Sequence, residues 1–396
     1  MVLEKWPGWM RPSWIEVDLD AIENNARRIK SHIKERRLLA VVKADAYGTG
    51  AVKVCPALLA GGVDLLGVVM IEEAIELRRA GIKAPILNMG AITADSAEWV
   101  LKYDLEQMVC RPEVIRALSA AAQKAGRPVR LHYKVDTGMS RYGAPWQSAA
   151  DRYLEVAVLP GIHFVGVMSH FAMSDALDKS YTLLQLDRFQ KVRREFQRRR
   201  ISGLLWHIAN SGATLDVPEA HLDGVRVGLM MYGFYPSAEV RRPFRLNPAV
   251  SLKSRIIGER EIGRGTSVGY GRRFIAQRRE RLGILPIGYA DGYSRSLRGR
   301  AVILIKGRRL PLIGGLCMDA CFIKLTDAPE VRTGDVATLM GRDGDDEISP
   351  HEIGEWMDSV SYEVLSGFGA RLPRVYLRGG KLVEICTSAE KNGSCK

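Results

Sequence analysis

The 396-residue sequence lacks long uncharged hydrophobic runs and has few cysteines. No stretch approaches the roughly 18 apolar residues that a membrane span requires, and the first twenty residues carry charges where a signal peptide has an apolar core. The six cysteines are scattered without a zinc-type CxxC pair, so we expect neither a disulfide framework nor a metal site. Internal repeats and low-complexity segments are also missing. The chain is therefore expected to be a cytoplasmic globular protein with no membrane partner.

Charge of one sign is in excess, with 58 basic against 45 acidic residues and a formal net charge of +13. Much of the excess lies in short arginine runs such as Arg193-Arg194, Arg198-Arg199-Arg200 and Arg278-Arg279. These runs are interleaved with Glu195 and Glu280, and no nucleic-acid-binding motif surrounds them. We therefore expect solvated surface and no nucleic-acid partner. A role in nucleic-acid binding rests on charge alone and predicts salt-dependent retention on DNA.

Buried-strand patterns alternate with amphipathic stretches over the first 230 residues. Eight such alternations are typical of a (β/α)₈ TIM-type barrel. The expected strands are Leu38–Lys43, Leu65–Met70, Pro85–Met89, Gln107–Cys110, Arg130–Val135, His163–His170, Trp206–Ala209 and Val225–Leu229. Expected helices between them include Glu72–Ala80, Pro112–Lys124 and Thr182–Arg200. The chain is thus expected to begin with an α/β barrel domain over residues 14–246.

The pattern changes after Asn247, where short β-rich runs alternate with turn signals. We expect a mostly antiparallel β domain over residues 247–396, and residues 1–13 are candidates to pack with it. Its expected strands are Ser254–Glu261, Arg281–Gly288, Ala301–Ile305, Cys321–Leu325 and Asp335–Met340, with turns at KGRRLP and GRDGDDE. The strand Trp14–Asp20 precedes a helix capped by Asp20 and Glu23, and fits either domain.

Polar residues stand where the expected barrel strands end, which is where barrel enzymes place their chemistry. Lys43 is the clearest case, because it follows five continuous apolar residues and precedes Tyr47, Gly48 and Gly50. Burial lowers the pKa of a lysine, and a neutral amine can attack a carbonyl to form a Schiff base. Taken alone, Lys43 is more simply a residue that returns the chain to water. The surrounding motifs reverse that preference.

From Ile15 to Leu377 the sequence resembles the alanine racemase family, whose members are pyridoxal-phosphate enzymes with a barrel followed by a β domain. The motifs that carry the resemblance are VVKADAYGTG, KVDTGMSRYG, SHFAMSD, HIANSGAT, VRVGLMMYG, SVGYG, PIGYADGYSR, GGLCMDACF and SYEVL…RLPRVYL. Each motif is weak by itself, but their joint occurrence in order is specific. The resemblance implies a homodimer that interconverts L- and D-alanine with pyridoxal 5'-phosphate and supplies D-alanine for peptidoglycan.

The resemblance assigns the catalytic roles to Lys43 and Tyr270. Lys43 would carry the cofactor as a Schiff base. Once the amine of the substrate has displaced it from the cofactor, Lys43 would act as one of two bases. Racemisation removes a proton from one face of Cα and supplies one to the other, so a second base is needed. By resemblance it is Tyr270 of SVGYG, contributed by the partner subunit. Without the motif, Tyr270 would be an ordinary turn tyrosine between glycines.

Further roles follow from the resemblance alone. Arg226 is expected to face the pyridine nitrogen, where a guanidinium donates a hydrogen bond without giving up a proton. The other cofactor-binding residues are His170, His207, Asn210 and, for the phosphate, Tyr47, Ser211, Gly228 and Leu229. Arg141 is expected to bind the substrate carboxylate, and Lys134 matches a lysine that many relatives carry as a carbamate. The partner subunit is expected to contribute Met318, Asp319 and Tyr289 to the substrate pocket.

One position departs from the family pattern. Ala370 stands where many relatives have a tyrosine that lines the inner pocket. The loss of a phenol there could widen the pocket, with Phe368 or Tyr376 as candidates to compensate. A serine racemase or a racemase of broad amino-acid range is therefore the alternative to strict alanine specificity.

Two other classes of barrel protein are alternatives to a racemase. Barrel decarboxylases of basic amino acids rely on a partner cysteine, whereas this chain offers Tyr270. Small barrel proteins that bind the cofactor for homeostasis lack a second domain, which the residues after Asn247 supply here.

Overall fold

The computed structural model describes residues 6–388, which divide into two compact units. One unit comprises residues 22–46 and 51–247, and the other comprises residues 6–21, 47–50 and 248–388. The expected domains and their flanking segment include residues 1–5 and 389–396, the latter with Cys395. These residues lie outside the described part of the chain. The domain limits 14–246 and 247–396 stay predictions. Within the described residues, no helix combines the length and the hydropathy needed to cross a bilayer.

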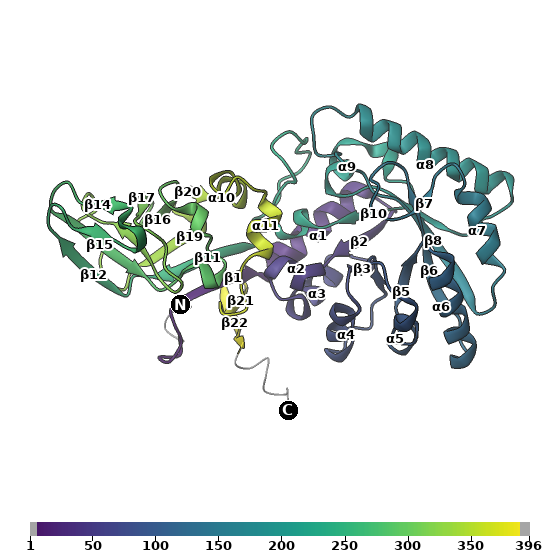
Figure 1. The fold of residues 1–396 in the computed structure, drawn as a ribbon, viewed down its shortest axis with the longest axis horizontal. Coiled ribbons are helices and arrows are strands. Elements are labelled where there is room, and N and C mark those ends of the chain that lie inside the picture. The colour runs from purple at the N-terminus through teal and green to yellow at the C-terminus, as the bar shows by residue number, and fades with distance from the viewer. Residues whose placement is uncertain (1–5, 389–396) are drawn as a thin grey trace. The chain divides into compact units, whose positions relative to one another are not determined.

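The first unit is a closed barrel of eight parallel strands in the described chain, as the alternating pattern predicted (Figure 1). The ring order is β5–β4–β3–β2–β10–β9–β8–β6, and pairing of β6 with β5 closes it. The strands are β2 (Arg37–Val41), β3 (Leu65–Val68), β4 (Ile86–Asn88), β5 (Glu106–Val109), β6 (Val129–Asp136), β8 (Ile162–Met168), β9 (Leu205–His207) and β10 (Gly224–Val227). The two-residue strand β7 (Ala144–Pro145) pairs with β6 outside the ring.

Helices surround the barrel, and their apolar faces explain the packing. In α6 the buried residues Val114, Ile115, Leu118 and Ala122 recur at helical spacing, Pro112 occupies the first turn, and Gly126 ends the helix in the left-handed region at φ 64°. The helices of this part are α1 (Leu19–Ile33), α2 (Lys43–Gly48), α3 (Ala51–Ala60), α4 (Ile71–Arg79), α5 (Ala97–Lys102), α6 (Pro112–Ala125), α7 (Ala149–Ala157), α8 (Ser180–Arg198) and α9 (Ser211–Asp216). Short 3₁₀ turns are η2 (Ala94–Ser96), η3 (Pro218–Ala220) and η4 (Leu229–Tyr232).

The start of α1 differs from the expectation. Asp18, not Asp20, accepts the first backbone hydrogen bonds, since its Oδ1 binds the N–H groups of Asp20 and Ala21 at 2.9 and 3.0 Å. Asp20 instead lies inside the first turn, where a carboxylate still interacts favourably with the helix dipole. The sequence motif therefore placed the cap two residues late.

The second unit is built on a largely antiparallel sheet with the order β12–β15–β18–β17–β16–β19–β11–β1–β21–β22, and β20 pairs with β19. The strand left open by the sequence, β1 (Ser13–Asp18), belongs here, antiparallel to β11 and parallel to β21. The other strands are β11 (Val250–Arg255), β12 (Gly258–Ile262), β13 (Ser267–Val268), β14 (Phe274–Ile275), β15 (Glu280–Leu285), β16 (Val302–Ile305), β17 (Arg308–Ile313), β18 (Cys321–Lys324), β19 (Val336–Asp343), β20 (Asp346–Ile348), β21 (Arg374–Arg378) and β22 (Lys381–Cys386). Its helical segments are α10 (Pro350–Trp356), α11 (Ser361–Ser366), η5 (Tyr270–Arg272), η6 (Tyr289–Asp291) and η7 (Arg295–Leu297).

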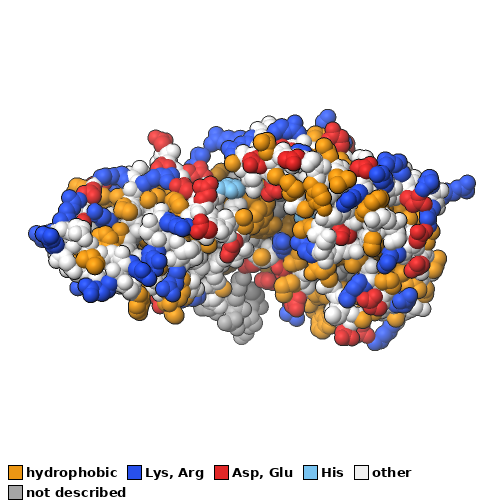
Figure 2. Space-filling model, turned by 45° about the horizontal axis from the view of Figure 1, so that its top comes forward, with side chains coloured by type: hydrophobic (Ala, Val, Ile, Leu, Met, Phe, Trp, Pro, Cys, Tyr) orange, Lys and Arg blue, Asp and Glu red, His pale blue; other side chains and the backbone are white. Residues whose placement is uncertain are grey.

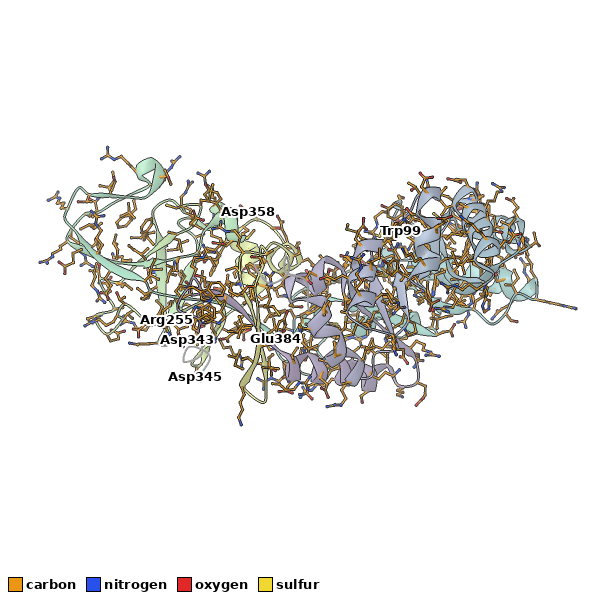
Figure 3. The ribbon with its side chains drawn as sticks, turned by 90° about the horizontal axis from the view of Figure 1, so that it is seen from below. Trp99, Arg255, Asp343, Asp345, Asp358 and Glu384 are labelled. Atoms are coloured by element: carbon orange, nitrogen blue, oxygen red, sulfur yellow. The ribbon has the colours of Figure 1, made fainter. Side chains whose placement is uncertain are left out.

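Two details of this sheet correct the sequence prediction. The expected strand Ser254–Glu261 is split into the end of β11 and most of β12, because the chain leaves one pairing and enters another at Ile256 and Ile257. The segment KGRRLP is a turn only at Lys306 and Gly307, and its remainder begins β17. Asp343 and Asp345, labelled in Figure 3, mark the β19–β20 hairpin that was predicted as a turn.

The surface charges are interleaved on the face shown in Figure 2, where basic and acidic side chains alternate over both units. On α8 and the residue that follows it, Arg198 and Arg199 both pair with Glu195, and Arg199 also reaches Asp151 at 2.6 Å. These two arginines are therefore neutralised locally, as expected for a solvated surface.

Candidate active site

Lys43 opens an unusual turn at the carboxyl end of β2. The four residues after it, Ala44, Asp45, Ala46 and Tyr47, all have φ between 52° and 56°, so α2 is a left-handed helical turn. Left-handed helix costs L-residues roughly 1–2 kcal/mol each, because Cβ crowds the following carbonyl oxygen. Strain of this kind persists only where the surrounding structure holds it in place. The turn therefore makes the carboxyl end of β2 a candidate functional position.

Glu73 holds the start of this turn. From the first turn of α4, its Oε1 accepts the Ala44 N–H at 2.6 Å, while its Oε2 accepts the N–H groups of Val69 and Met70 at 3.0 and 3.2 Å. One carboxylate thus ties the end of β3 to the residue that follows Lys43. Asp45 acts similarly on the next helix, since its Oδ1 accepts the N–H of Ala51 at 2.8 Å.

Arg226 is buried at the end of β10, with 3% of its surface exposed. Its Nη1 donates to Nδ1 and the carbonyl oxygen of His207 at 3.0 and 2.8 Å. Its Nη2 donates to the carbonyl oxygens of Ser169 and Ile208 and to Nδ1 of His170 at 3.1 Å. Among the described residues no acceptor faces its Nε–H. The guanidinium is therefore rigidly held with one donor left for a ligand.

Both histidines that contact Arg226 are neutral. Burial, followed by the charge of Arg226, holds the pKa values of His170 and His207 well below the usual range. Because an arginine only donates, each of these rings must accept at Nδ1 and carry its proton on Nε2. His170 therefore presents an Nε2–H donor away from Arg226.

Four basic side chains share the carboxyl end of the barrel. Burial lowers the pKa of Lys43, of Lys134 and of Arg226, the last to about 9, and the charge of Arg141 adds to each shift. None of the four has an ion pair with an acid within residues 6–388, although Glu73 opposes the shift at Lys43. Buried charges are normally paired. A group of basic side chains without acidic partners is the environment that an anionic ligand would complete.

The loop after β6 carries Arg141 and is organised by Asp136. Oδ1 of Asp136 accepts the N–H groups of Gly138, Met139 and Ser140 at 2.9 to 3.1 Å. Asp136 is therefore a loop anchor and forms no ion pair with Lys134. Arg141 itself is exposed, which leaves its guanidinium accessible to a ligand.

The residues expected at the phosphate lie together at the start of α9 and η4. Ser211 Oγ accepts the N–H of Gly228 at 3.2 Å, and Leu229 follows as a fully buried residue. The side chain of Asn210 has a structural task, because its Oδ1 caps α9 at Ala213 and accepts a hydrogen bond from Ser174 Oγ. Asn210 thus shapes the loop that presents Ser211, and its expected contact with the cofactor stays a prediction.

Tyr47 belongs with the segment 47–50 to the second unit. Its ring lies 6.2 Å from that of Tyr362, and burial raises its pKa, so it stays a neutral phenol. Arg374 Nε donates to the Gly48 carbonyl at 3.0 Å, and Tyr376 Oη donates to that of Thr49 at 2.9 Å. A Cβ at Gly50 would meet Tyr376 Oη at 1.8 Å, so only glycine fits there.

The residues expected from a partner subunit gather on the second unit. Tyr270 follows Gly269, which pairs with Gly315 in a β-bridge. The loops of Tyr289 and Met318 are joined by a hydrogen bond from Tyr289 N–H to the Cys317 carbonyl at 3.2 Å. Tyr270 is 72% exposed, Met318 51% and Tyr289 37%, and Asp319 is also exposed. Such exposure of large side chains suits residues that complete a site elsewhere.

Sequence reasoning missed three side chains that organise the barrel. Glu73 holds the turn after Lys43, and Glu106 and His132 continue the hydrogen bonds of His207. A signal existed for His132, because it lies in the predicted strand Arg130–Val135 between the buried Leu131 and Tyr133. Glu106 directly precedes the predicted strand Gln107–Cys110 and did not stand out. Glu73 gave no such signal, since an acidic residue in the first turn of a helix is ordinary.

Comparison with known proteins now decides the family. Residues 17–236 match the family described as "Alanine racemase, N-terminal domain", and residues 249–376 match "Alanine racemase, C-terminal domain". The chain belongs to the alanine racemase family. It is therefore an isomerase of that family, with the barrel and sheet that the resemblance implied.

Relatives support this assignment over nearly the whole chain. The alanine racemase of Clostridium tetani is 42% identical over 379 residues, which cover 95% of this chain and 98% of the relative. That of Symbiobacterium thermophilum is 41% identical over 367 residues, or 93% and 97% of the two chains. The crystal structure of alanine racemase from Bacillus anthracis with bound L-Ala-P superposes with a TM-score of 0.92 at 33% identity, covering 97% of this chain and all of that one.

Proposed function

We propose that the protein interconverts L- and D-alanine by a two-base mechanism, using pyridoxal 5'-phosphate held by Lys43. The observation that supports the proposal best is the group of basic side chains at the carboxyl end of the barrel, Lys43, Lys134, Arg141 and Arg226, which lack acidic partners among the described residues. The anionic groups of the cofactor and of an amino acid would supply the missing negative charge. The ligand L-Ala-P in the Bacillus anthracis enzyme is consistent with this substrate class.

The side chains present fit the cofactor. The Nε–H of Arg226, the one donor of this guanidinium without a protein acceptor in the described chain, would face the ring nitrogen. Ser211, Gly228 and Leu229 would hold the phosphate, together with Tyr47, and His170 and His207 would lie beside the ring. When bound, the cofactor withdraws electrons from Cα of the substrate. Because Arg226 donates without losing its proton, the ring nitrogen would stay unprotonated.

The protein's own contribution is to hold and move protons at Cα. Lys43 Nζ would exchange a proton on one face, helped by a pKa that burial and Arg141 lower. Tyr270 Oη, from the partner subunit, would exchange a proton on the opposite face. Arg141 would bind the substrate carboxylate, and Met318, Asp319 and Tyr289 of the second unit would line the pocket in the partner's site.

Lys134 is a candidate for carbamylation. Burial, Arg226 and Arg141 hold the pKa of Lys134 well below its usual value, so its amine is available as a nucleophile. Addition of this neutral amine to carbon dioxide forms an N–C bond and releases one proton, which turns the neutral side chain into an anionic carbamate near Arg226 and Arg141. We expect a carbamate carbon signal in ¹³C NMR after equilibration with ¹³C-bicarbonate, and its loss in Lys134→Ala. Without such a signal in the wild type, Lys134 is an ordinary buried amine.

Ala370 keeps the second candidate function open. It lies in the loop between α11 and β21, at the position where the resemblance implies a tyrosine that would narrow the inner pocket. Serine or a broader range of amino acids is therefore the alternative substrate class. If alanine is the substrate, the product would be D-alanine, which the cell would use in the cytoplasm for peptidoglycan synthesis.

The decisive experiment is racemisation of L-alanine and L-serine in deuterated water, with the visible spectrum of the purified protein recorded. We expect a cofactor band that disappears in Lys43→Ala, and fastest entry of deuterium at Cα of alanine. Lys102→Ala, on the exposed face of α5, serves as the matched control. Faster turnover of serine would move the substrate assignment to the alternative. Bound cofactor without exchange into either amino acid would contradict a racemase.

A second experiment tests the shared site. Lys43→Ala and Tyr270→Phe dimers, each inactive alone, are mixed under conditions that exchange subunits. If Tyr270 serves the partner's Lys43, half of the sites in each mixed dimer are intact, and activity returns to about a quarter of wild type. If each site lies within one chain, the mixture stays inactive.

A further inference from the structure

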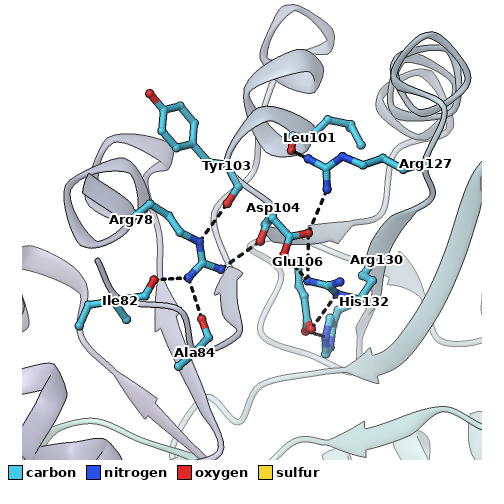
Figure 4. A network of polar contacts seen from close by, with 10 residues as sticks. All are labelled: Arg78, Ile82, Ala84, Leu101, Tyr103, Asp104, Glu106, Arg127, Arg130 and His132. Carbon is cyan, nitrogen blue, oxygen red and sulfur yellow. Dashed lines mark hydrogen bonds and ion pairs between the residues drawn. The ribbon is translucent and has the colours of Figure 1, made fainter. Parts of the chain in front are cut away.

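A chain of hydrogen bonds runs through the barrel interior from Arg226 toward the amino-terminal end of the strands. Nε2 of His207 lies 2.9 Å from Nδ1 of His132 in β6, and Nε2 of His132 lies 2.8 Å from Oε2 of Glu106, the first residue of β5. All three side chains are buried, with exposures of 1%, 1% and 9%. Figure 4 shows the Glu106 end of the chain, where Arg130 contacts both Glu106 and Asp104.

The donors and acceptors in this chain have one consistent arrangement. Arg226 can only donate, so Nδ1 of His207 accepts and its proton is on Nε2. That proton is donated to Nδ1 of His132, whose own proton is therefore on Nε2 and is donated to Glu106. Any other placement would set two donors or two acceptors against each other. The carboxylate at the far end thus determines which nitrogen of His207 faces Arg226.

Glu106 is suited to be this fixed acceptor. Burial raises its pKa, but the hydrogen bond from His132 and the hydrogen bond and positive charge of Arg130 outweigh burial and keep the pKa below the usual value. Arg130 Nε donates to Oε1 of Glu106 at 3.2 Å, which leaves Oε2 for His132. The ionised carboxylate therefore accepts from both sides and cannot donate to either.

We propose that Glu106 is a positioning residue for Arg226, acting through His132 and His207 across the barrel. The proposal rests on the proposed function, in which Arg226 faces the cofactor's ring nitrogen. Without Glu106, the His132 Nε2–H has no acceptor, so His132 and then His207 are free to change tautomer. A proton on Nδ1 of His207 would oppose the Arg226 N–H, and Arg226 would lose one of the anchors that aim its Nε–H.

A cavity beside Glu106 makes the proposal testable by chemical rescue. The amino-terminal mouth of the barrel holds a space of about 470 Å³ whose lining includes Glu106, His132 and His207. Truncation of Glu106 to alanine would extend this space by the volume of a carboxylate. Formate is small enough to enter it and can accept the His132 proton in place of Glu106.

The experiment combines histidine-ring NMR with kinetics on the cofactor-loaded enzyme. With ¹⁵N-labelled histidine, of which the chain has seven, we expect His132 and His207 in the wild type to be neutral with the proton on Nε2. In Glu106→Ala their signals should change, and kcat should fall about tenfold, the equivalent of one hydrogen bond, with KM for alanine little changed. Formate should restore both. Asp104→Ala removes the other acid that contacts Arg130 and is the matched control, expected to leave the ring signals, kcat and formate response as in wild type.

Three outcomes would overturn the proposal. The first is a wild-type His207 with its proton on Nδ1, which needs no variant to observe. The second is a Glu106→Ala enzyme with unchanged ring signals and kcat. The third is a kcat loss that formate does not reverse although thermal unfolding shows an intact fold. If Glu106→Ala does not fold, Glu106→Leu, which fills more of the space and also lacks an acceptor, replaces it, with the same expected changes in ring signals and kcat. A wild-type protein without turnover would refute the proposed function, while its ring spectra would still decide the hydrogen-bond chain.

Discussion

The two ends of the barrel treat charge in opposite ways. At the amino-terminal end, basic side chains have acidic partners: Arg130 contacts Asp104 and Glu106, and Lys30 contacts Asp64 at 2.7 Å. At the carboxyl end, Lys43, Lys134, Arg141 and Arg226 have none within residues 6–388. Both ends are built from the same eight strands, so the difference is one of side chains and not of fold. The paired charges at the amino-terminal end stabilise the barrel, whereas the unpaired basic groups at the carboxyl end form the candidate active site.

The unpaired end is held in a costly state. Burial lowers the pKa values of its basic groups, and a left-handed turn follows Lys43. These features oppose folding and persist because other parts of the barrel hold them in place. The paired end supplies part of that support, since the Glu106–His132 chain reaches Arg226 through His207. Function at one end therefore depends on stability at the other.

The comparison would break if a change at the amino-terminal end, made outside the Glu106–His132 chain, altered chemistry as much as stability. Arg78 donates to the carbonyl oxygens of Tyr103, Ile82, Ala84 and Asp104 at 2.7 to 3.1 Å (Figure 4). Arg78→Met leaves these carbonyls without a donor, and we expect the free energy of unfolding to fall by about 3 kcal/mol. The kcat of the folded enzyme should stay as in wild type. Urea unfolding and a racemisation assay on the same preparation measure both.

The matched control for Arg78 is Arg79→Met, which removes the neighbouring arginine at the end of the same helix. It should leave the urea midpoint unchanged. A fall in kcat for Arg78→Met with an unchanged unfolding midpoint would contradict a purely structural role for this residue.

A change at the carboxyl end should do the reverse. Arg141→Ala removes an exposed guanidinium whose loop is held by Asp136 and not by Arg141 itself. We expect kcat/KM for alanine to fall by about 30-fold, the loss of one charged hydrogen-bonding contact of about 2 kcal/mol. The unfolding midpoint should be unchanged, and Arg152→Ala, on the exposed face of α7, is the control. An unchanged kcat/KM would show that another residue binds the carboxylate.

The sequence predicted the fold well because barrel strands are continuous apolar runs with regular spacing. All eight predicted strands overlap those observed, and the residues at their ends, Lys43, His170 and Arg226, lie at one end of the barrel. Periodicity could not predict the turn after Lys43, since Ala44 and Ala46 strongly favour right-handed helix. Its backbone is determined by distant contacts such as that of Glu73. Tertiary constraints, and not local preference, set the geometry of the site.

Glu73 offers a further test of the difference between the two ends of the barrel. It is an acid at the carboxyl end, but its carboxylate accepts backbone N–H groups in place of a basic side chain. Glu73→Ala leaves the N–H groups of Ala44, Val69 and Met70 without their acceptor. We expect the turn to loosen and kcat to fall about tenfold, with a smaller effect on KM. Glu72→Ala, exposed on the same helical turn, should change neither. Equal kinetics for the two variants would show that the left-handed turn holds Lys43 without Glu73.

The smallest expected effect is the pH dependence of stability at the unpaired end. His170 and His207 have pKa values well below 6.5 in the folded barrel, because of burial and Arg226, while the unfolded chain has ordinary histidines. As the pH falls below about 6.5, the unfolded state takes up protons that the folded state does not, so stability is lost on acidification. Each histidine contributes at most about 1.4 kcal/mol per pH unit.

Urea midpoints between pH 7.5 and 5.5 measure this slope. In His207→Gln the slope should decrease by the share of one histidine, about 1 kcal/mol over the first pH unit below 6.5. His163→Gln, which removes an exposed histidine of β8, is the control and should keep the wild-type slope. If His207→Gln also keeps it, His207 is protonated in the folded protein, and the donor–acceptor order from Arg226 to Glu106 fails with it. The measurement therefore tests, at equilibrium and without substrate, whether the neutral histidines at one end of the barrel are tied to the charged network at the other.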